Sequence, residues 1–446
     1  MSEISIVWPL TALVWLVLVG FYPRQGMWFV LLWVGVQGWF QINVFDDSAA
    51  TVLLYEFMIF AIYLMFFVRA LRFPRDYGPP RVMATALPFA VWILLIVPFS
   101  VEQGGVVLTG IGLRTYLFPI PLVWVGYCAF RSRREIEAVG ALLSLESAAI
   151  GLIAALQFMN LVTPSGSVIE VPKGFVSVGV LRPPGTFSSP GHFGMYILAM
   201  IPLGVGFLGL KTNRWRNICY KLGLGGAALS LVVNSQRATV VLLSVCLPLL
   251  AFFARSARAV KAVLVATGMA AIGVVIGLSV VGDAFSRRIR AIMDDASYTL
   301  RIAPIERMTA AFGNPWAGGG LGIASPGTIR LDLDALKSAE SFYAALVYQM
   351  GLPGLLFFAL LLAALLTAGY HALSMCREQD VGVLAAAILV YELAICLDSW
   401  SYDPLHYPPS RVLFWFWAGV LLSLPHLHGR GKPSPARASV FIPRSS

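Results

Sequence analysis

Arginine residues at the ends of predicted apolar runs are the side chains best suited to chemistry in this sequence. Arg114 begins one run, Arg182 lies in Leu181-Arg-Pro-Pro-Gly-Thr-Phe-Ser-Ser-Pro190, and Arg237 lies in the short connection between two runs. A guanidinium group offers a planar fork of N–H donors that matches phosphate or carboxylate. These arginines predict an anion site, although lipid head groups or a neighbouring acid would also satisfy them.

Glu340 is the carboxylate that best fits a proton-transfer role. It closes a long connection and precedes the apolar run that begins near Phe342. A carboxylate can accept the proton of a hydroxyl group, particularly where burial raises its pKa toward neutrality. Lys337 lies one turn earlier in the sequence, so an ion pair between Glu340 and Lys337 is the alternative interpretation.

Weaker candidates for ligand contact lie near the ends of two other apolar runs. His192 follows Ser188-Ser-Pro-Gly191, where packing or helix capping would also explain it. Trp400, Tyr402 and His406 share a short connection. Their rings would stack on sugars or would simply lie at a membrane interface.

Metal and nucleotide chemistry find little support in the sequence. No set of His, Cys or carboxylate residues has metal-site spacing, so we expect neither a metal nor another cofactor. Asp46 and Asp47 form the acidic pair that would matter if a divalent ion were needed. The stretch Gly318-Gly-Gly-Leu-Gly322 lacks the Lys-Ser/Thr of a nucleotide-binding loop, so ATP binding is not expected.

The composition identifies the elements that must position these residues. The chain has 446 residues, of which 58% are hydrophobic and 12% charged, with a mean hydropathy of +0.79. Soluble domains carry about 25% charged residues, so a soluble globular enzyme is excluded. Continuous apolar runs without strand-like alternation predict an all-α, polytopic membrane protein. The expected spans lie near 6–20, 27–42, 50–68, 83–100, 115–130, 138–160, 191–209, 218–233, 238–254, 262–281, 342–366, 381–398 and 411–425.

The net charge of +10 reflects membrane topology and not nucleic-acid binding. Basic residues gather in alternate connections, near 69–81, 131–134, 211–221, 255–261, 377 and 430–444. The positive-inside rule makes these connections cytoplasmic. The count is 13 helices if residues 21–26 form a true cytoplasmic turn and 12 if they do not, and the position of the N-terminus changes with that count.

The long connection at 282–341 is expected to be a structured external loop. It carries seven basic and seven acidic residues, so it is not a polybasic tail, and Arg301 is one of its arginines. Ile302, Ile305, Met308 and Phe312 recur at the spacing of an amphipathic helix. The chain therefore divides into helices 1–10 (1–281), the loop (282–341), helices 11–13 (342–425) and a disordered cytoplasmic tail (426–446).

Four pieces in this order resemble the O-antigen ligase and polymerase superfamily of bacterial envelope glycosyltransferases. They are Arg182-Pro-Pro-Gly-Thr-Phe187, Ser235-Gln-Arg237, Asn314-Pro-Trp-Ala-Gly-Gly-Gly-Leu-Gly322, and Glu340-Ser-Phe-Tyr343 followed by Gly351-Leu-Pro-Gly-Leu355. The resemblance covers about residues 180 to 365.

The resemblance implies a membrane fold of the GT-C-like kind in the inner membrane, with its site facing the periplasm. It implies a donor glycan carried on undecaprenyl diphosphate, and a glycan or the lipid A core as acceptor. Other envelope polysaccharide assembly proteins would be further partners. Arg182 and Arg237 take the place of the donor diphosphate ligands, with Arg114 and Arg301 as further candidates. Glu340 takes the place of the catalytic base.

One departure from the family and one other class leave alternatives open. Ligases of this family commonly carry a His-Asn pair where this chain has Glu340-Ser341. That difference favours polymerisation of lipid-linked repeat units over transfer to lipid A core, which remains the alternative. A transporter or flippase is the rival of another class, because Glu56, Glu146 and Glu392 fall within predicted spans.

Overall fold

The computed structural model describes twelve stretches of the chain. They are residues 14–43, 49–162, 176–177, 180–181, 183–234, 236–257, 259–269, 271–272, 275, 316–324, 341–376 and 381–429, without the side chains of 42–43, 49–53, 176–177, 180–181, 237 and 428–429. The elements are α2 (Pro23–Asn43), α3 (Ala49–Arg72), α4 (Pro74–Tyr77), η1 (Arg81–Ala86), α5 (Leu87–Tyr116), α6 (Leu122–Cys128), α7 (Arg133–Phe158), β1 (Val176–Ser177), β2 (Val180–Leu181), α8 (Pro190–Leu208), α9 (Arg214–Asn234), α10 (Arg237–Ala254), α13 (Phe342–Cys376), α14 (Gly382–Asp398), η5 (Pro404–His406) and α15 (Pro408–Gly429).

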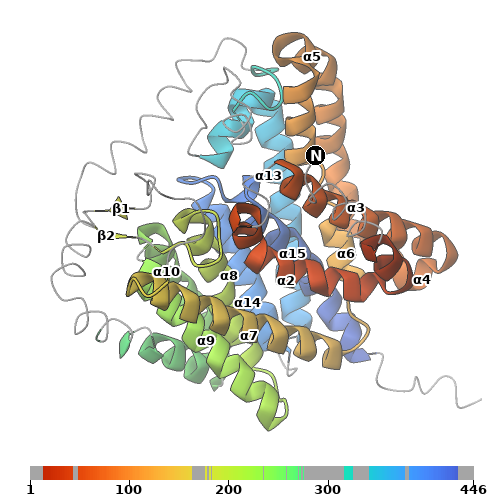
Figure 1. The fold of residues 1–446 in the computed structure, drawn as a ribbon. Coiled ribbons are helices and arrows are strands. Elements are labelled where there is room, and N and C mark those ends of the chain that lie inside the picture. The colour runs from red at the N-terminus through yellow and green to blue at the C-terminus, as the bar shows by residue number, and fades with distance from the viewer. Residues whose placement is uncertain are drawn as a thin grey trace, which may run out of the picture.

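The described chain folds into a bundle of apolar helices (Figure 1). Six helical stretches are long and apolar enough to cross a bilayer, namely Leu54–Arg72, Arg81–Tyr116, Arg133–Phe158, Pro190–Leu208, Phe342–Cys376 and Pro408–Leu427. Large apolar side chains such as Leu94, Leu95 and Leu360 are exposed on the outside of the bundle. Apolar surface of this kind requires lipid around it. The protein is an α-helical membrane protein, as its composition predicts.

Helix α14 forms the centre of the bundle. Its residues are buried on almost every side, and it packs against α8, α10, α13 and α15. A helix that is apolar all round is expected at such a central position. The surrounding helices approach one another closely where glycines face a neighbouring backbone. Gly151 on α7 lies against Gly226 on α9, and Gly126 on α6 lies against the backbone of α15. Small residues at such contacts are how membrane helices come together.

Three helical hairpins shape the bundle, and the first one is at Tyr22. Residues 14–21 are helical, and α2 begins directly after Tyr22. The Trp15 and Phe29 rings have centroids 5.2 Å apart, whereas fourteen residues of straight helix would separate them by about 21 Å. The chain therefore reverses at Tyr22, within the 21–26 stretch where the sequence left a turn open.

The other two hairpins reverse at glycines inside α5 and α13. Gly105 has φ 78° and ψ 171°, and Gly351 has φ 69° and ψ −176°, conformations that are essentially restricted to glycine. The N–H of Leu321 donates to Ser100 Oγ at 2.9 Å, and Leu321 also packs against Gly112. These contacts bring residues 100 and 112 together, although a straight helix would hold them about 18 Å apart.

The reversal in α13 has similar support. The Phe342 and Phe358 rings lie 5.2 Å apart across it. The expected span 342–366 is therefore two limbs, 342–350 and 352–376. The α5 and α13 hairpins stand close together, and α5 projects at the top of Figure 1. The indole N–H of Trp92 ties them by donating to the Met350 carbonyl at 3.0 Å.

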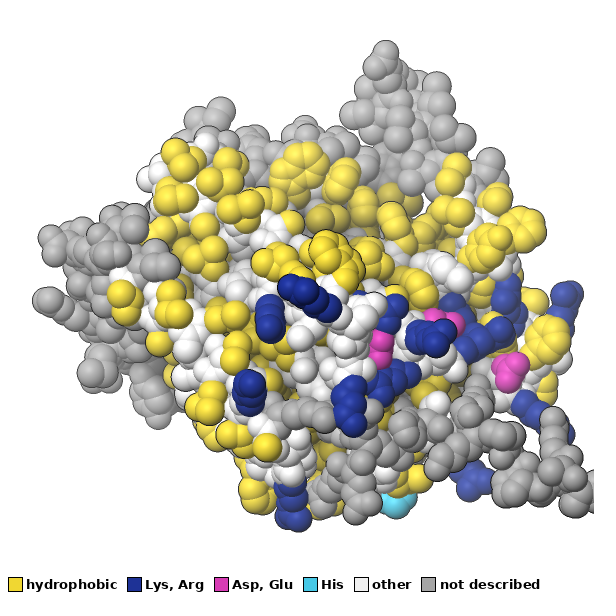
Figure 2. Space-filling model, turned by 90° about the horizontal axis from the view of Figure 1, so that it is seen from below, with side chains coloured by type: hydrophobic (Ala, Val, Ile, Leu, Met, Phe, Trp, Pro, Cys, Tyr) yellow, Lys and Arg dark blue, Asp and Glu magenta, His cyan; other side chains and the backbone are white. Residues whose placement is uncertain are grey.

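The two ends of the bundle differ in character. We call the end that holds residues 399–407 the loop end, and the end where α7 and α9 begin the basic end. Helices α7 and α9 finish at the loop end, where Gln157 binds Gly185 and Asn234 binds Pro190. Figure 2, seen from below the view of Figure 1, shows Lys and Arg side chains spread over the lower face with few acidic ones.

Candidate functional site

A buried charged cluster lies near the loop end of the bundle. The Glu56 carboxylate of α3 forms an ion pair with Arg114 of α5 and faces the Arg411 guanidinium of α15 at 3.5 Å. The Arg411 side chain is 3% exposed and that of Arg114 is 32% exposed. One carboxylate thus serves two guanidinium groups. We call Glu56, Arg114 and Arg411 the arginine pair cluster.

The hairpin in α5 explains why this cluster forms. The second limb, 106–116, runs back along the bundle from Gly105 and carries Arg114 to Glu56. The Tyr63 hydroxyl of α3 donates to the carbonyl of Phe118, which lies just after the end of α5, at 2.8 Å. This hydrogen bond fixes α3 to the end of the second limb. The cluster keeps one positive charge without a matching carboxylate among its three members. A charge in such a place is costly unless a counter-ion joins it, so the cluster is suited to an anionic ligand.

A histidine–aspartate pair lies next to this cluster on the connection from α14 to α15. His406 Nδ1 is paired with Asp403, and both side chains are almost fully buried. The Tyr116 ring lies 5.3 Å from the His406 ring and the Phe342 ring lies 5.1 Å from it. Burial raises the pKa of the Asp403 carboxyl above its usual range, and the neighbouring His406 partly offsets that rise. Tyr116 is two residues from Arg114, so the pair and the cluster are adjoining parts of one polar region.

Gln349 connects this region to the glycine-rich stretch. The side-chain Nε2 of Gln349 donates to the Tyr116 hydroxyl at 2.8 Å, and its side-chain Oε1 accepts from the Gly322 N–H at 2.6 Å. Gly318, Gly320 and Gly322 all have positive φ, and Gly322 packs directly on the α5 backbone. The glycines therefore allow a tight turn that packs between the two hairpins.

His192 lies at the loop end beside two tyrosines. The Ser188 hydroxyl is 2.9 Å from His192 Nδ1, and the Tyr407 ring lies 4.2 Å from the His192 ring. Tyr402 stacks on Tyr407 with ring centroids 6.1 Å apart. Because Tyr407 belongs to the same connection as His406, His192 adjoins the polar region described above. Trp400 is 68% exposed and packs at the edge, 6.3 Å from the Tyr343 ring.

The backbone of Arg237 lies at the same end of the bundle. Helix α10 begins at Arg237, and the residues on either side of it are fixed to α8. The Asn234 amide donates to the Pro190 carbonyl at 2.9 Å, and the Thr239 hydroxyl donates to the Gly194 carbonyl at 3.2 Å. Arg237 therefore starts its helix beside the first turns of α8, which carry His192. Its side chain lies outside the described part of the chain.

Ser341, the residue after Glu340, is also at this end. The Phe342 N–H lies 3.1 Å from both the Ser399 and Tyr402 carbonyl oxygens, which fixes the start of α13 to the 399–402 turn. Glu340, Arg182 and Arg301 lie outside the described residues, as do Asp46 and Asp47. Pro183, which follows Arg182, is buried.

The structure therefore gathers several of the expected site residues at one end. Arg114, His192, Tyr402 and His406 lie there together with the backbone of Arg237, and Trp400 lies at the margin. In the parts of the chain that the structure describes, no group of three or more His, Cys, Asp or Glu side chains could hold a metal ion.

Sequence reasoning did not single out Arg411, Asp403 or Gln349. Arg411 carried a usable signal, because it opens the last predicted span and is an arginine at a loop-end boundary, as Arg114 is. Asp403 and Gln349 carried none, since only the fold brings them to His406 and Tyr116.

No protein-family model matches the chain, and no curated protein matches it.

Proposed function

We propose that the protein is a metal-independent membrane glycosyltransferase that polymerises oligosaccharide repeat units carried on undecaprenyl diphosphate. The observation that carries the proposal is the arginine pair cluster, in which Glu56 balances only one of two guanidinium groups, the buried Arg411 and the half-buried Arg114. A diphosphate would supply the missing negative charge. The aromatic rings of Tyr402 and Tyr407 beside it offer apolar faces of the kind that stack on sugars.

In this reaction an acceptor hydroxyl oxygen attacks the anomeric carbon of the donor sugar. The bond from that carbon to the diphosphate oxygen breaks, and the hydroxyl proton passes to a base. Arg114 and Arg411, with Arg182 and Arg237 as expected from the sequence, would neutralise charge on the departing diphosphate. Stabilisation of developing charge is usually the largest catalytic contribution. Glu340 is the proposed base. Ser341, the next residue in the sequence, is held at the loop end because the start of α13 is hydrogen-bonded to the 399–402 turn.

The proposed setting is the inner membrane, with the loop end facing the periplasm and 12 or 13 spans in all. One observation supports it. The basic end carries the arginine clusters near 131–134 and 211–221, which the positive-inside rule assigns to the cytoplasm. The reversal at Tyr22 fits both counts, because a separate first span and a re-entrant element would both turn there.

Transfer of the glycan to lipid A core or another acceptor is the second candidate within this chemistry. The observation that favours it is the presence of two histidines, His192 and His406, in the polar region at the loop end. His406 is held by Asp403 and enclosed by rings, so His192 is the better placed of the two.

Transport is the alternative of another class. Glu392 is a buried acid inside the bundle and Glu146 is a half-buried one, which favours an ion pathway. Glu56, by contrast, is engaged by two arginines, and the Tyr196 hydroxyl binds Glu146 at 3.3 Å. Transfer and transport separate in detergent, where only transfer changes the length or linkage of a lipid-linked glycan.

The decisive experiment is single-turnover transfer by purified protein with a defined undecaprenyl-diphosphate oligosaccharide, followed by mass spectrometry of the product. Polymerisation gives integral multiples of the repeat unit, and the activity persists in excess EDTA. Glu340→Gln should lower turnover by roughly 100-fold while donor affinity changes little, because the amide keeps the shape and cannot accept a proton.

Two variants provide the controls. Lys337→Ala removes the alternative partner of Glu340, and it should retain near-normal turnover if Glu340 is the base. Arg237→Lys keeps the charge but loses the planar fork, so most activity should be lost. Equal and mild effects of Glu340→Gln and Lys337→Ala would reduce Glu340 to a structural acid. Loss of activity in EDTA, with recovery on adding a divalent ion, would move the mechanism to Asp46 and Asp47.

A further inference from the structure

The basic end of the bundle carries a second site, built where α7 and α9 begin. The two helices pack side by side and run parallel, because Ser144 faces Gly223 and, one turn further along both helices, Ala148 faces Gly226. Both first turns therefore lie at the same end. The N-termini of helices carry partial positive charge from unpaired backbone N–H groups.

The residues around these two first turns are mostly basic. The segments 131–137 and 211–221 carry seven basic residues and two acidic ones, Glu135 and Glu137. Arg131, Arg134, Lys211, Arg214 and Lys221 are exposed. Arginines in the first turn of a helix are opposed by the helix dipole, by about 0.3–1 kcal/mol each. Their accumulation at two adjacent N-termini therefore needs a counter-ion.

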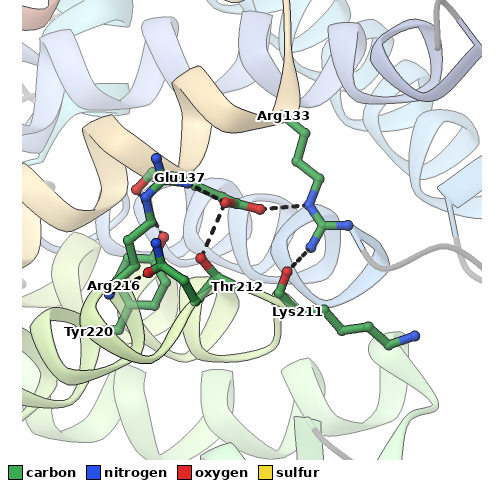
Figure 3. Close-up of polar contacts among 7 residues, drawn as sticks. Arg133, Glu137, Lys211, Thr212, Arg216 and Tyr220 are labelled. Atoms are coloured by element: carbon green, nitrogen blue, oxygen red, sulfur yellow. Dashed lines mark hydrogen bonds and ion pairs between the residues drawn. The ribbon is translucent and has the colours of Figure 1, made fainter.

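Glu137 organises the centre of this basic site (Figure 3). Its carboxylate binds the Arg133 Nε at 2.8 Å and also pairs with Arg216, and it accepts from the Thr212 hydroxyl at 3.2 Å. The Tyr220 hydroxyl donates to the Glu137 backbone carbonyl at 2.9 Å. Glu137 itself is buried, whereas the Arg133 and Arg216 side chains are 24% and 26% exposed. The ion pairs with Glu137 therefore hold the exposed parts of the Arg133 and Arg216 side chains in a fixed position.

Glu137 is shared by Arg133 and Arg216. Among the described residues, no second buried acid pairs with the exposed Arg134 and Arg214 of the two first turns. Figure 3 shows the Lys211 side chain extended away from Glu137. The site therefore presents a ring of cations around two helix N-termini, an arrangement suited to a phosphate group.

The surface next to this ring is apolar. Trp215 is 69% exposed, and Ile218 and Leu222 follow it at helical spacing, also exposed. Leu142 and Leu145 of α7 are exposed as well. A tryptophan beside arginines, with aliphatic residues continuing along the helix, is typical of the boundary between lipid head groups and acyl chains.

We propose that this site, defined by Arg131, Arg133, Arg134, Lys211, Arg214 and Arg216, binds the phosphate head group of an anionic phospholipid. The phosphate lies at the two helix N-termini, and the acyl chains follow the stripe of Trp215, Ile218 and Leu222. A soluble phosphate compound would use the same cations but would gain nothing from the apolar stripe. The site is independent of the proposed transferase chemistry, which lies at the opposite end of the bundle.

Native mass spectrometry of the purified full-length protein tests the proposal. The protein in neutral detergent is titrated with phosphatidylglycerol, and bound lipid is counted. The double variant Arg134→Gln/Arg214→Gln removes one exposed arginine from each first turn and leaves the Glu137 network intact. Its affinity should fall by roughly 25-fold, because each basic residue at an anionic surface contributes about fivefold. The matched control is Arg75→Gln/Arg81→Gln, which removes two exposed arginines outside the site and should leave the affinity within about twofold.

Three outcomes would overturn the proposal. Equal losses in both double variants would mean diffuse attraction to surface charge. Retention of phosphatidylcholine as strong as that of phosphatidylglycerol would exclude recognition of an anionic head group. Displacement of the bound phosphatidylglycerol by millimolar glycerol 1-phosphate would identify a soluble phosphate ligand instead of a lipid. Selective loss in Arg134→Gln/Arg214→Gln, without such displacement, supports it.

Discussion

Arg411 and Glu56 should respond differently to substitution, although they share one ion-pair cluster. Arg411→Gln leaves Glu56 paired with Arg114 and removes a buried charge that is itself costly to desolvate, so we expect the stability to change by less than about 1 kcal/mol. Glu56→Gln removes the carboxylate that both guanidinium groups share, and should cost about 3 kcal/mol. Thermal unfolding of both variants in the same detergent measures the difference.

Activity provides the second half of this prediction. If Arg411 supplies charge to a leaving diphosphate, Arg411→Gln should transfer glycan roughly 100-fold more slowly than the wild type. The exposed Arg81 offers a matched control, since Arg81→Gln removes the same charge far from the loop end. If Arg411→Gln were as unstable as Glu56→Gln, Arg411 would be a structural partner and not a ligand for an anion.

Asp403 should make stability depend on pH. Burial raises the pKa of its carboxyl above the usual 3.8 in the folded protein. The folded state therefore binds this proton more tightly than the unfolded chain does. The stability contributed by this group is fully present below pH 3.8 and declines as the pH rises through the folded-state pKa. Asp403→Asn cannot ionise, so its melting temperature should fall less steeply above about pH 4.

The environment of Asp403 makes that comparison interpretable. His406 is its direct partner, and Tyr116 is a further titratable side chain close to the pair. Tyr116→Phe keeps the ring and serves as a control that should preserve the wild-type slope. An equally steep slope in Asp403→Asn would assign the pH dependence to other groups.

Parts of the site were predictable because arginine at the loop end of a span is unusual in itself. That signal identifies Arg114 without any structure. Its partner Glu56 is 58 residues away, and Asp403 gains its importance only from burial beside His406. Sequence spacing carries no information on such long-range contacts, so the charge balance of the cluster could not be predicted.

At the scale of elements, Gly105 is expected to be essential for the α5 hairpin. A Cβ at this position would meet nothing within 4 Å, so crowding does not explain the glycine. Its φ of 78° and ψ of 171° are the reason. Gly105→Ala should lower the free energy of unfolding by about 1–3 kcal/mol through backbone strain alone.

Gly110 is the matched control in the same element. It also has open space around it, and it does not have a positive φ. Gly110→Ala should be neutral or should stabilise the helix by about 0.5–1 kcal/mol. Similar melting temperatures for Gly105→Ala and Gly110→Ala would show that the reversal tolerates ordinary residues.

The hairpins also mark where span prediction from hydropathy reaches its limit. The expected spans 191–209 and 381–398 agree closely with α8 and α14, because polar or breaking residues bound them. The expected span 342–366 crosses Gly351, where Gln349, Gly351 and Pro353 interrupt the apolar run without specifying a reversal. Its reversal depends on distant contacts, such as Trp92 with Met350 and Gly318 with Gln349.

At the scale of the whole molecule, the orientation can be tested with two tryptophans. Trp400 at the loop end and Trp215 at the basic end are 68% and 69% exposed. Four of the five native cysteines are buried and the fifth, Cys396, is half-buried, so background labelling should be low. In right-side-out spheroplasts, Trp400→Cys should react with a membrane-impermeant maleimide, and Trp215→Cys should react only after permeabilisation.

The reverse pattern would invert the proposed topology and place the arginine pair cluster on the cytoplasmic side. Labelling of both positions in sealed spheroplasts would indicate leaky membranes, which a cytoplasmic marker enzyme detects. The positive-inside rule supports the first pattern, because the basic residues concentrate at the end that carries Trp215.

The tip of the α5 hairpin determines how deep the polar region lies. Val106 and Val107 next to the tip are 73% and 60% exposed, so hydrocarbon must reach at least that level. Arg114 follows Gly105 by nine residues, about 13 Å of helix rise. Arg114 therefore lies well below the apolar tip of the hairpin. We expect a membrane-anchored molecule to reach Arg114 by diffusing sideways within the leaflet, whereas a soluble one would first have to pass the apolar tip.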